Sequence, residues 1–181
     1  GLAFAAALHV VADLVGFTPS EPAWFCQAKA REPHQTVAQR WQTRRKPCGG
    51  SATWRYLHDA RGIPEPVLRQ AIAADVLREG PHGSMWAGHT DETGQVTGWE
   101  QRGKEWRGFA SGGAKVLFRL GATDATRLCV TEAAIDAMSL AAIERSPPGS
   151  LYLSTGGGWS PSTEAALRWL AARPDVLLVA A

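Results

Sequence analysis

Cysteine is scarce in this 181-residue chain, and long hydrophobic runs are missing. The three cysteines, Cys26, Cys48 and Cys129, are odd in number and include no Cys-x-x-Cys pair. This disfavours a disulfide-stapled fold and indicates a reducing, cytoplasmic compartment. No stretch reaches the ~20 apolar residues of a membrane span, so no membrane contact is expected. The composition, 45% hydrophobic and 20% charged, excludes wholesale disorder, collagen and coiled coil.

Both ends of the chain have unusual residues. It begins at Gly1 without a methionine and stops at Ala181 inside an apolar run. We therefore interpret the chain as an excerpt of a longer protein, cut at both ends. Its length predicts one compact domain with an appendage.

The basic residues are unevenly spread, although the net charge is only +2. Residues 24–55 carry seven basic side chains against the single acid Glu32. Prolines and paired glycines interrupt residues 17–50, which indicates a basic linker with room for one short helix over residues 35–44. Its cluster of Arg44, Arg45 and Lys46 is a candidate contact for a polyanion. A merely solvated linker remains an equal alternative.

Helical and strand patterns alternate in the first two thirds of the chain. Apolar spacing predicts an amphipathic helix within residues 1–16, ended by Gly16. Ser51 is a suitable N-cap for a helix to Ala60, and Pro64 begins another to about residue 74. Short runs predict strands over residues 85–89, 95–100 and 115–120. Residues 51–122 are thus expected to form a helical hairpin and a small β region.

The last segment, residues 123–181, has the most regular pattern. Strand-like runs over residues 127–131, 151–154 and 176–181 are separated by helical patterns over 133–144 and 162–172. This β-α-β-α-β order predicts the α/β fold class, with parallel strands joined by right-handed crossovers. The apolar run from Val176 to Val179 is typical of a strand buried on both faces.

Two acidic residues follow the first of these strands. Glu132 stands at its carboxyl end and Asp136 one helical turn later, so both carboxylates are expected to face the ligand-binding crevice of such a sheet. A pair of this kind suits Mg²⁺, which takes one or two carboxylates together with water and phosphate oxygens. Spacing alone leaves open an acid that stabilises the helix dipole beside an exposed Asp.

Glycines follow the second strand, in Ser154-Thr155-Gly156-Gly157-Gly158. The backbone at Gly156 and Gly157 can approach a phosphate closely, although a tight turn explains the same residues. No Gly-Lys-Ser/Thr follows, which excludes a Walker loop. Between Trp99 and Arg119, basic and aromatic residues are interleaved, a pattern found in nucleic-acid contacts and equally in the core of a small sheet.

Taken in order, these segments resemble the catalytic core of bacterial DnaG-type primases, and more closely the Toprim proteins of plasmids and other mobile elements. The resemblance depends most on Leu128-Cys129-Val130-Thr131-Glu132-Ala133-Ala134-Ile135-Asp136, a strand that ends in Glu and a helix with Asp four residues on. It extends to the segments Leu151 to Gly158, Tyr56 to Ile63, Gly98 to Arg102 and Gly113 to Lys115. Ala133 departs from the family, which usually has Gly there.

The resemblance implies an incomplete Toprim-like fold, since the acidic metal-binding motif of the family would follow Ala181. Residues 1–16 resemble the last helix of a zinc-binding primase domain, whose zinc ligands would lie upstream. The implied activity is primer synthesis on single-stranded DNA from nucleoside triphosphates, with Mg²⁺ held by Glu132 and Asp136. Arg102 and Lys115 would then contact the triphosphate or the template.

A helicase or another replication protein is an expected partner, and the excerpt by itself is expected to be inactive. Two alternatives remain open at this stage. One is a Toprim nuclease or strand-transfer protein, since the same carboxylates serve cleavage. The other is a non-catalytic single-strand-binding module of a conjugative element.

Overall fold

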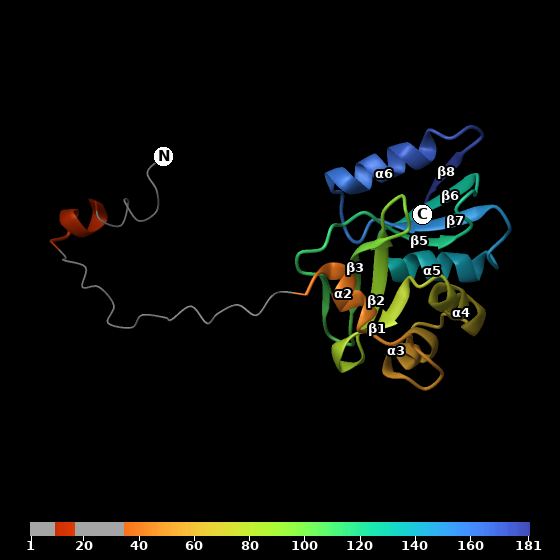
Figure 1. Cartoon of the computed structure of the whole chain (residues 1–181), viewed down its shortest axis with the longest axis horizontal. Coiled ribbons are helices and arrows are strands. Elements are labelled where there is room, and N and C mark those ends of the chain that lie inside the picture. Colours follow the sequence, from red (N-terminus) through yellow and green to blue (C-terminus); the bar gives the residue numbers. More distant parts are fainter. Residues whose placement is uncertain (1–9, 17–34) are drawn as a thin grey trace. The chain divides into compact units, whose positions relative to one another are not determined.

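The computed structural model describes residues 10–16 and 35–181, which belong to two separate units, Gly1–His34 and Gln35–Ala181 (Figure 1). In the first unit, residues 10–14 are helical, and Gly16 has a positive φ of 65°. This is the backbone that a helix end requires. The remainder of the helix expected within residues 1–16 lies outside the described residues.

The second unit is built on one mixed eight-stranded sheet, within residues 35–181. Its order is β4-β3-β2-β5-β7-β6-β8, and β1 pairs with β2. The three strands β7, β6 and β8 are parallel and the other pairs antiparallel. The predicted α/β class with a parallel β-α-β-α-β segment is confirmed. The strand bounds are β1 Leu77–Glu79, β2 Met85–Thr90, β3 Val96–Arg102, β4 Arg107–Phe109, β5 Leu117–Gly121, β6 Arg127–Thr131, β7 Ser150–Ser154 and β8 Leu177–Ala180.

Helices cover both faces of the sheet (Figure 1). One face packs against α3 (Ala52–Arg55), the π-helical turn Tyr56–Ala60, α4 (Glu65–Ala73) and α5 (Ala134–Ile143). The other face packs against α2 (Val37–Gln42) and α6 (Pro161–Ala171). Successive side chains of strand β7 point to opposite faces of the sheet. Tyr152 belongs to the hydrophobic core on the α5 side, whereas its neighbours Leu151 and Leu153 belong to the core on the α6 side. No helix in the described ranges is long and apolar enough to cross a membrane.

The helical hairpin expected before the sheet is present. The Ser51 hydroxyl accepts a hydrogen bond from the Trp54 N–H at 3.3 Å, so Ser51 is the N-cap of α3. Gly62 has φ +69° and ends the pair of turns, and Pro64 precedes α4. Val67, Leu68 and Ala71 form the buried face of α4. These local signals therefore act as the sequence predicts.

The sequence predicts a linker over residues 17–50, but its described part, residues 35–50, is folded against the sheet. Trp41 of α2 is 1% exposed and packs on Trp99, with ring centroids 5.9 Å apart. Arg78 extends beneath this segment and donates to the backbone carbonyls of Trp41, Gln42 and Arg44. The buried indole therefore anchors a stretch whose prolines and charges indicate a loop.

The sheet continues across residue 122, where the sequence predicts a boundary, because β5 pairs with β2 on one side and with β7 on the other. One other expectation differs from the structure. Strand β8 is an edge strand with Leu177 and Leu178 more than half exposed, so it is not covered on both faces as predicted. Strands β1 and β4, of three residues each, are too short to show an alternating pattern.

The burial of Trp41 predicts that Trp41→Ala strongly lowers the stability of the protein. Truncating this buried indole should lower the free energy of unfolding by about 3–5 kcal/mol, because it leaves a cavity between α2 and the sheet. Urea denaturation measures the change. Trp169→Ala is the matched control, since Trp169 is 56% exposed and its loss should change stability by less than about 1 kcal/mol. Equal effects of the two substitutions would show that α2 is not anchored by Trp41.

Candidate active site

A pocket of about 380 Å³ opens where β3, β4, β6 and β7 present their loops. Five of the residues singled out from the sequence line it, namely Arg102, Lys115, Glu132, Gly156 and Gly157. The remaining lining residues are Glu100, Arg107, Gly108 and Phe109. Residues from distant segments of the chain, 100–115 and 132–157, therefore meet at one site.

The floor of the pocket is the carboxylate of Glu100, which is only 3% exposed. It accepts hydrogen bonds from the Ser154 hydroxyl at 2.6 Å and from the Ala134 backbone N–H at 3.1 Å. His89 Nε2 lies 3.1 Å from the same carboxylate and, because an ionised carboxylate can only accept, donates to it. Glu100 thus joins β2, β3, β7 and the start of α5.

These donors decide the charge of Glu100. Burial raises the pKa of the Glu100 carboxyl, but the hydrogen bond and charge of His89, with donation from Ser154 and Ala134, outweigh burial and hold the pKa below its ordinary value. Glu100 is therefore an anion beneath the pocket near neutral pH.

The glycine loop after β7 lies directly on this network. The Gly157 N–H donates to the Glu132 carbonyl at 2.9 Å, and the Ser154 hydroxyl is 3.1 Å from the same oxygen. A Cβ at Gly156 would come within 2.8 Å of His89 Cε1, so no side chain fits there. Gly156 also has φ +68°, a conformation that favours glycine. The loop and Glu132 are thus held together by backbone contacts.

The rim of the pocket carries three cations, Arg102, Arg107 and Lys115. None of them forms an ion pair with a carboxylate in the described part of the chain. Arg102 and Arg107 stand directly opposite each other in the β3–β4 register, and like charges in that arrangement destabilise a sheet. An anion between them removes this repulsion, so the rim is suited to a phosphate.

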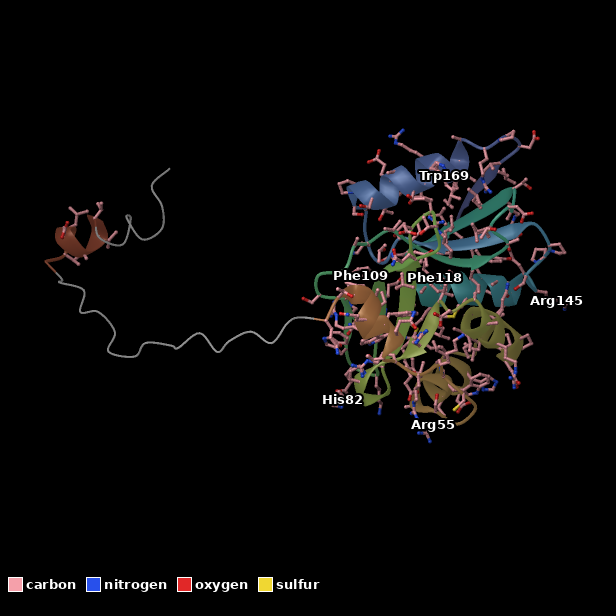
Figure 2. The ribbon with its side chains drawn as sticks, in the orientation of Figure 1. Arg55, His82, Phe109, Phe118, Arg145 and Trp169 are labelled. Carbon is pink, nitrogen blue, oxygen red and sulfur yellow. The ribbon has the colours of Figure 1, made fainter. Side chains whose placement is uncertain are left out.

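Lys115 is oriented by its surroundings. Its ammonium lies 5.4 Å from the centroid of the Phe109 ring, a cation–π contact. Its carbonyl accepts hydrogen bonds from Ser160 at 2.6 Å and from Thr163 at 2.9 Å, which tie it to the first turn of α6. Figure 2 shows Phe109 at the margin of the folded unit, next to α2 and β3.

The two predicted acids do not converge. Glu132 is exposed and lines the pocket, whereas Asp136 does not line it. The Asp136 carboxylate instead accepts the Ala133 N–H at 3.1 Å, as the capping residue of α5. The Asp136 carboxylate therefore satisfies a backbone N–H at the start of α5, a role that its spacing did not predict.

The donor set fits a hard cation only in part. In the described residues no group of three or more His, Cys, Asp and Glu side chains could hold a metal ion. Glu132 is the one exposed carboxylate of the pocket, since the Glu100 oxygens are already engaged. Mg²⁺ takes one or two carboxylates and completes its shell with water and phosphate, so Glu132 suits an ion that arrives with a nucleotide.

Comparisons with known proteins match two neighbouring segments of the chain, and both segments contribute residues to this pocket. Residues 129–181 match the family described as Toprim-like. This segment is therefore similar to Toprim-like domains and is called here the Toprim-like domain. Residues 55–125 match a family described as "Protein of unknown function (DUF3991)". No curated protein matches the chain. The Toprim resemblance drawn from the sequence is confirmed by the match to residues 129–181.

One solved structure is similar, the crystal structure of the RNA polymerase domain of Mycobacterium tuberculosis primase DnaG. The identity is 16% and the TM-score 0.47, over 80% of this chain. This chain spans 61% of the length of that one. A likeness of this degree carries no information about activity.

The pocket lies between the two matched segments. The Toprim-like domain supplies Glu132 and the glycine loop, and the preceding segment supplies Arg102 and Lys115. Glu100 and Arg107 are pocket residues that the sequence does not single out. The sequence marks them only weakly. Glu100 is an acid that lowers the positive charge of a basic stretch, and Arg107 belongs to a three-residue strand.

The predicted contacts Arg44, Arg45 and Lys46 lie outside the pocket. The Arg44 guanidinium is 5.1 Å from the centroid of the Trp86 ring, and Arg45 bonds to the carboxylate of Glu79. Lys46 is 3.6 Å from Asp75. The structure thus uses these charges to fasten residues 44–46 to the fold.

The loop geometry predicts different effects for two neighbouring glycines. Gly156→Ala and Gly157→Ala both place a side chain at positive φ, which is unfavourable by about 1–2 kcal/mol. Only Gly156→Ala adds a clash with His89, since nothing lies within 4 Å of a Cβ at Gly157. Gly156→Ala should therefore lower the urea midpoint further, and equal midpoints would show that the loop does not rest on His89.

The lowered pKa of Glu100 predicts that the protein loses stability at acid pH. Its pKa is lower in the folded than in the unfolded chain, so its stabilisation is present above the unfolded pKa of about 4.3 and is lost as pH falls through the folded pKa. Glu100→Gln should flatten the fall of unfolding free energy below about pH 5. At neutral pH it should destabilise the protein by about 1–3 kcal/mol. An unchanged pH slope would contradict an ionised Glu100.

Proposed function

We propose that this protein is a primase-like Toprim nucleotidyltransferase that acts on single-stranded DNA with Mg²⁺. The observation that supports the proposal is the pocket itself. Three cations that form no ion pair within residues 10–16 and 35–181, Arg102, Arg107 and Lys115, line the pocket with one exposed carboxylate, Glu132, beside a glycine loop. Positive charge around a single metal-binding carboxylate suits a triphosphate bound with its cation.

Each residue then has a distinct part in the reaction. Arg102 and Arg107 bind phosphate oxygens of the incoming nucleotide, and Lys115 neutralises charge that develops on the leaving pyrophosphate. Gly156 and Gly157 leave room for the phosphates to approach the backbone. Mg²⁺, when bound, polarises the transferred phosphate for attack by the primer hydroxyl.

The carboxylates act at different distances from the reaction. Glu132 holds the metal or accepts the proton of the attacking hydroxyl. Asp136 acts on Glu132 indirectly, since its carboxylate accepts a hydrogen bond from the N–H of Ala133, the residue next to Glu132. We thus assign Asp136 to positioning of the metal ligand.

The wider setting follows from the same proposal. Nucleoside triphosphates and single-stranded DNA are the substrates, and a helicase or another replication protein is a partner of the reaction. Priming on a plasmid or another mobile element, in the cytoplasm, is the process that such a protein would serve.

Glu132→Gln tests the assignment directly. Measured in the full-length protein, it should abolish Mg²⁺-dependent primer synthesis on single-stranded DNA, because the amide neither binds Mg²⁺ as an anion nor accepts a proton. Glu164→Gln is the matched control, since Glu164 is an exposed acid on α6 that pairs with Arg168, and it should retain activity. Chelation of Mg²⁺ should abolish synthesis in both the wild type and the control.

Three outcomes would contradict the proposal. Primer synthesis that survives Glu132→Gln would remove Glu132 from the reaction. Mg²⁺-dependent cleavage of DNA without synthesis would favour a Toprim nuclease or strand-transfer protein. DNA binding with neither activity, unchanged by Glu132→Gln, would favour a single-strand-binding module.

A further inference from the structure

The pocket continues into a second hollow on the same side of the sheet. This hollow, of about 270 Å³, shares Arg102 and Arg107 with the pocket and extends from the β3–β4 hairpin to the π-helical turn. Its other lining residues are Tyr56, Arg61, Gly103, Lys104, Glu105 and Trp106. Pocket and hollow therefore form one continuous surface, called here the hairpin track.

The charge of the hairpin track is mainly positive. Arg61 and Lys104 extend the row of cations that begins with Lys115, Arg107 and Arg102, and only Glu105 opposes them in the hollow. Neither Arg61 nor Lys104 pairs with a carboxylate in the described ranges. A row of cations without internal partners is complementary to a row of phosphates.

Aromatic rings stand between these cations. Trp106 is 55% exposed, and the benzenoid part of its indole lies over Gly108, where a Cβ would come within 2.8 Å of it. Tyr56 accepts hydrogen bonds from Arg61 at 3.1 and 3.2 Å, and the Arg61 guanidinium lies 5.4 Å from its ring centroid. Gly108 thus makes room for the indole, and Tyr56 orients the arginine.

We propose that the hairpin track binds single-stranded DNA, which runs from the pocket across the β3–β4 hairpin to the π-helical turn. A base stacks on Trp106, and phosphates of the strand contact Arg61 and Lys104, beyond the two arginines assigned to the incoming nucleotide. The inference rests on the proposed function, from which the strand is taken to be DNA. Cations alternating with an exposed ring are what a flexible single strand requires, since every base offers a π-face to stack.

The experiment measures fluorescence anisotropy of a labelled oligothymidylate of about 12 nucleotides, within the range that one such site covers. Trp106→Ala should weaken binding about ten-fold, because stacking of one base contributes about 1–3 kcal/mol. Trp106→Phe should restore most of the affinity. The matched control is Trp169→Ala, since Trp169 is 56% exposed and should leave affinity within about two-fold of the wild type.

A second pair of variants tests the phosphate contacts. Arg61→Gln should reduce the slope of log affinity against log salt by about 0.7, the value for one phosphate of a single strand. Arg145→Gln, an exposed arginine elsewhere, should leave the slope unchanged. Figure 2 shows Arg145 at the opposite margin of the folded unit from Phe109 and His82. Phe109 borders the pocket, and His82 borders a cavity beside Trp106.

The outcomes separate the hairpin track from the catalytic assignment. Equal affinities of Trp106→Ala and Trp169→Ala would overturn the track, as would an unchanged salt slope in Arg61→Gln or no binding of oligothymidylate by the wild type. Loss of synthesis in Glu132→Gln, with strand affinity unaffected by Trp106→Ala, would leave the proposed function standing and refute the track alone.

Discussion

The buried carboxylate of Glu100 is the interaction on which the site depends. An anion at 3% exposure is stable only where donors surround it, and here the donors come from β2, β7 and the start of α5. Because Ser154 also contacts the Glu132 carbonyl, the same network holds the glycine loop and the strand end that carries Glu132. Removing the charge of Glu100 therefore loosens several elements at once, although Glu100 lies on a strand that precedes the Toprim-like domain.

This arrangement explains why the sheet is continuous across the two matched segments. Strand β5 pairs with β2 on one side and with β7 on the other. Because the sheet is continuous, the cations of the β3–β4 hairpin line the same pocket as the glycine loop. Arg102 and Arg107 stand opposite each other and repel across the hairpin, and a bound anion would relieve this repulsion. The local repulsion thus lies where the proposed function places a phosphate, while a buried tryptophan cluster around Trp41 holds this side of the sheet together.

Much of the fold could be predicted from the sequence, because its signals are local. Ser51 caps a helix, and the strands of the Toprim-like domain have distinct apolar runs. The site was harder to predict. Glu132 and the glycine loop were found because they follow strands, but Glu100 acts through partners far away in the chain, which no spacing reveals. Conversely, Asp136 has the spacing of a ligand and is used as a cap, since a carboxylate at the third helical position reaches the backbone first.

The central claim, that phosphates and a metal ion bind between Glu132 and the glycine loop, can be tested by nuclear magnetic resonance. Mn²⁺, a paramagnetic substitute for Mg²⁺, is titrated into the protein together with a nucleoside triphosphate, and the broadening of backbone amide signals is mapped. We predict that the amide signals of Glu132, Gly156 and Gly157 broaden first, and that Glu132→Gln removes this broadening. Broadening centred on the α6 surface near Trp169, or persisting in Glu132→Gln, would contradict it.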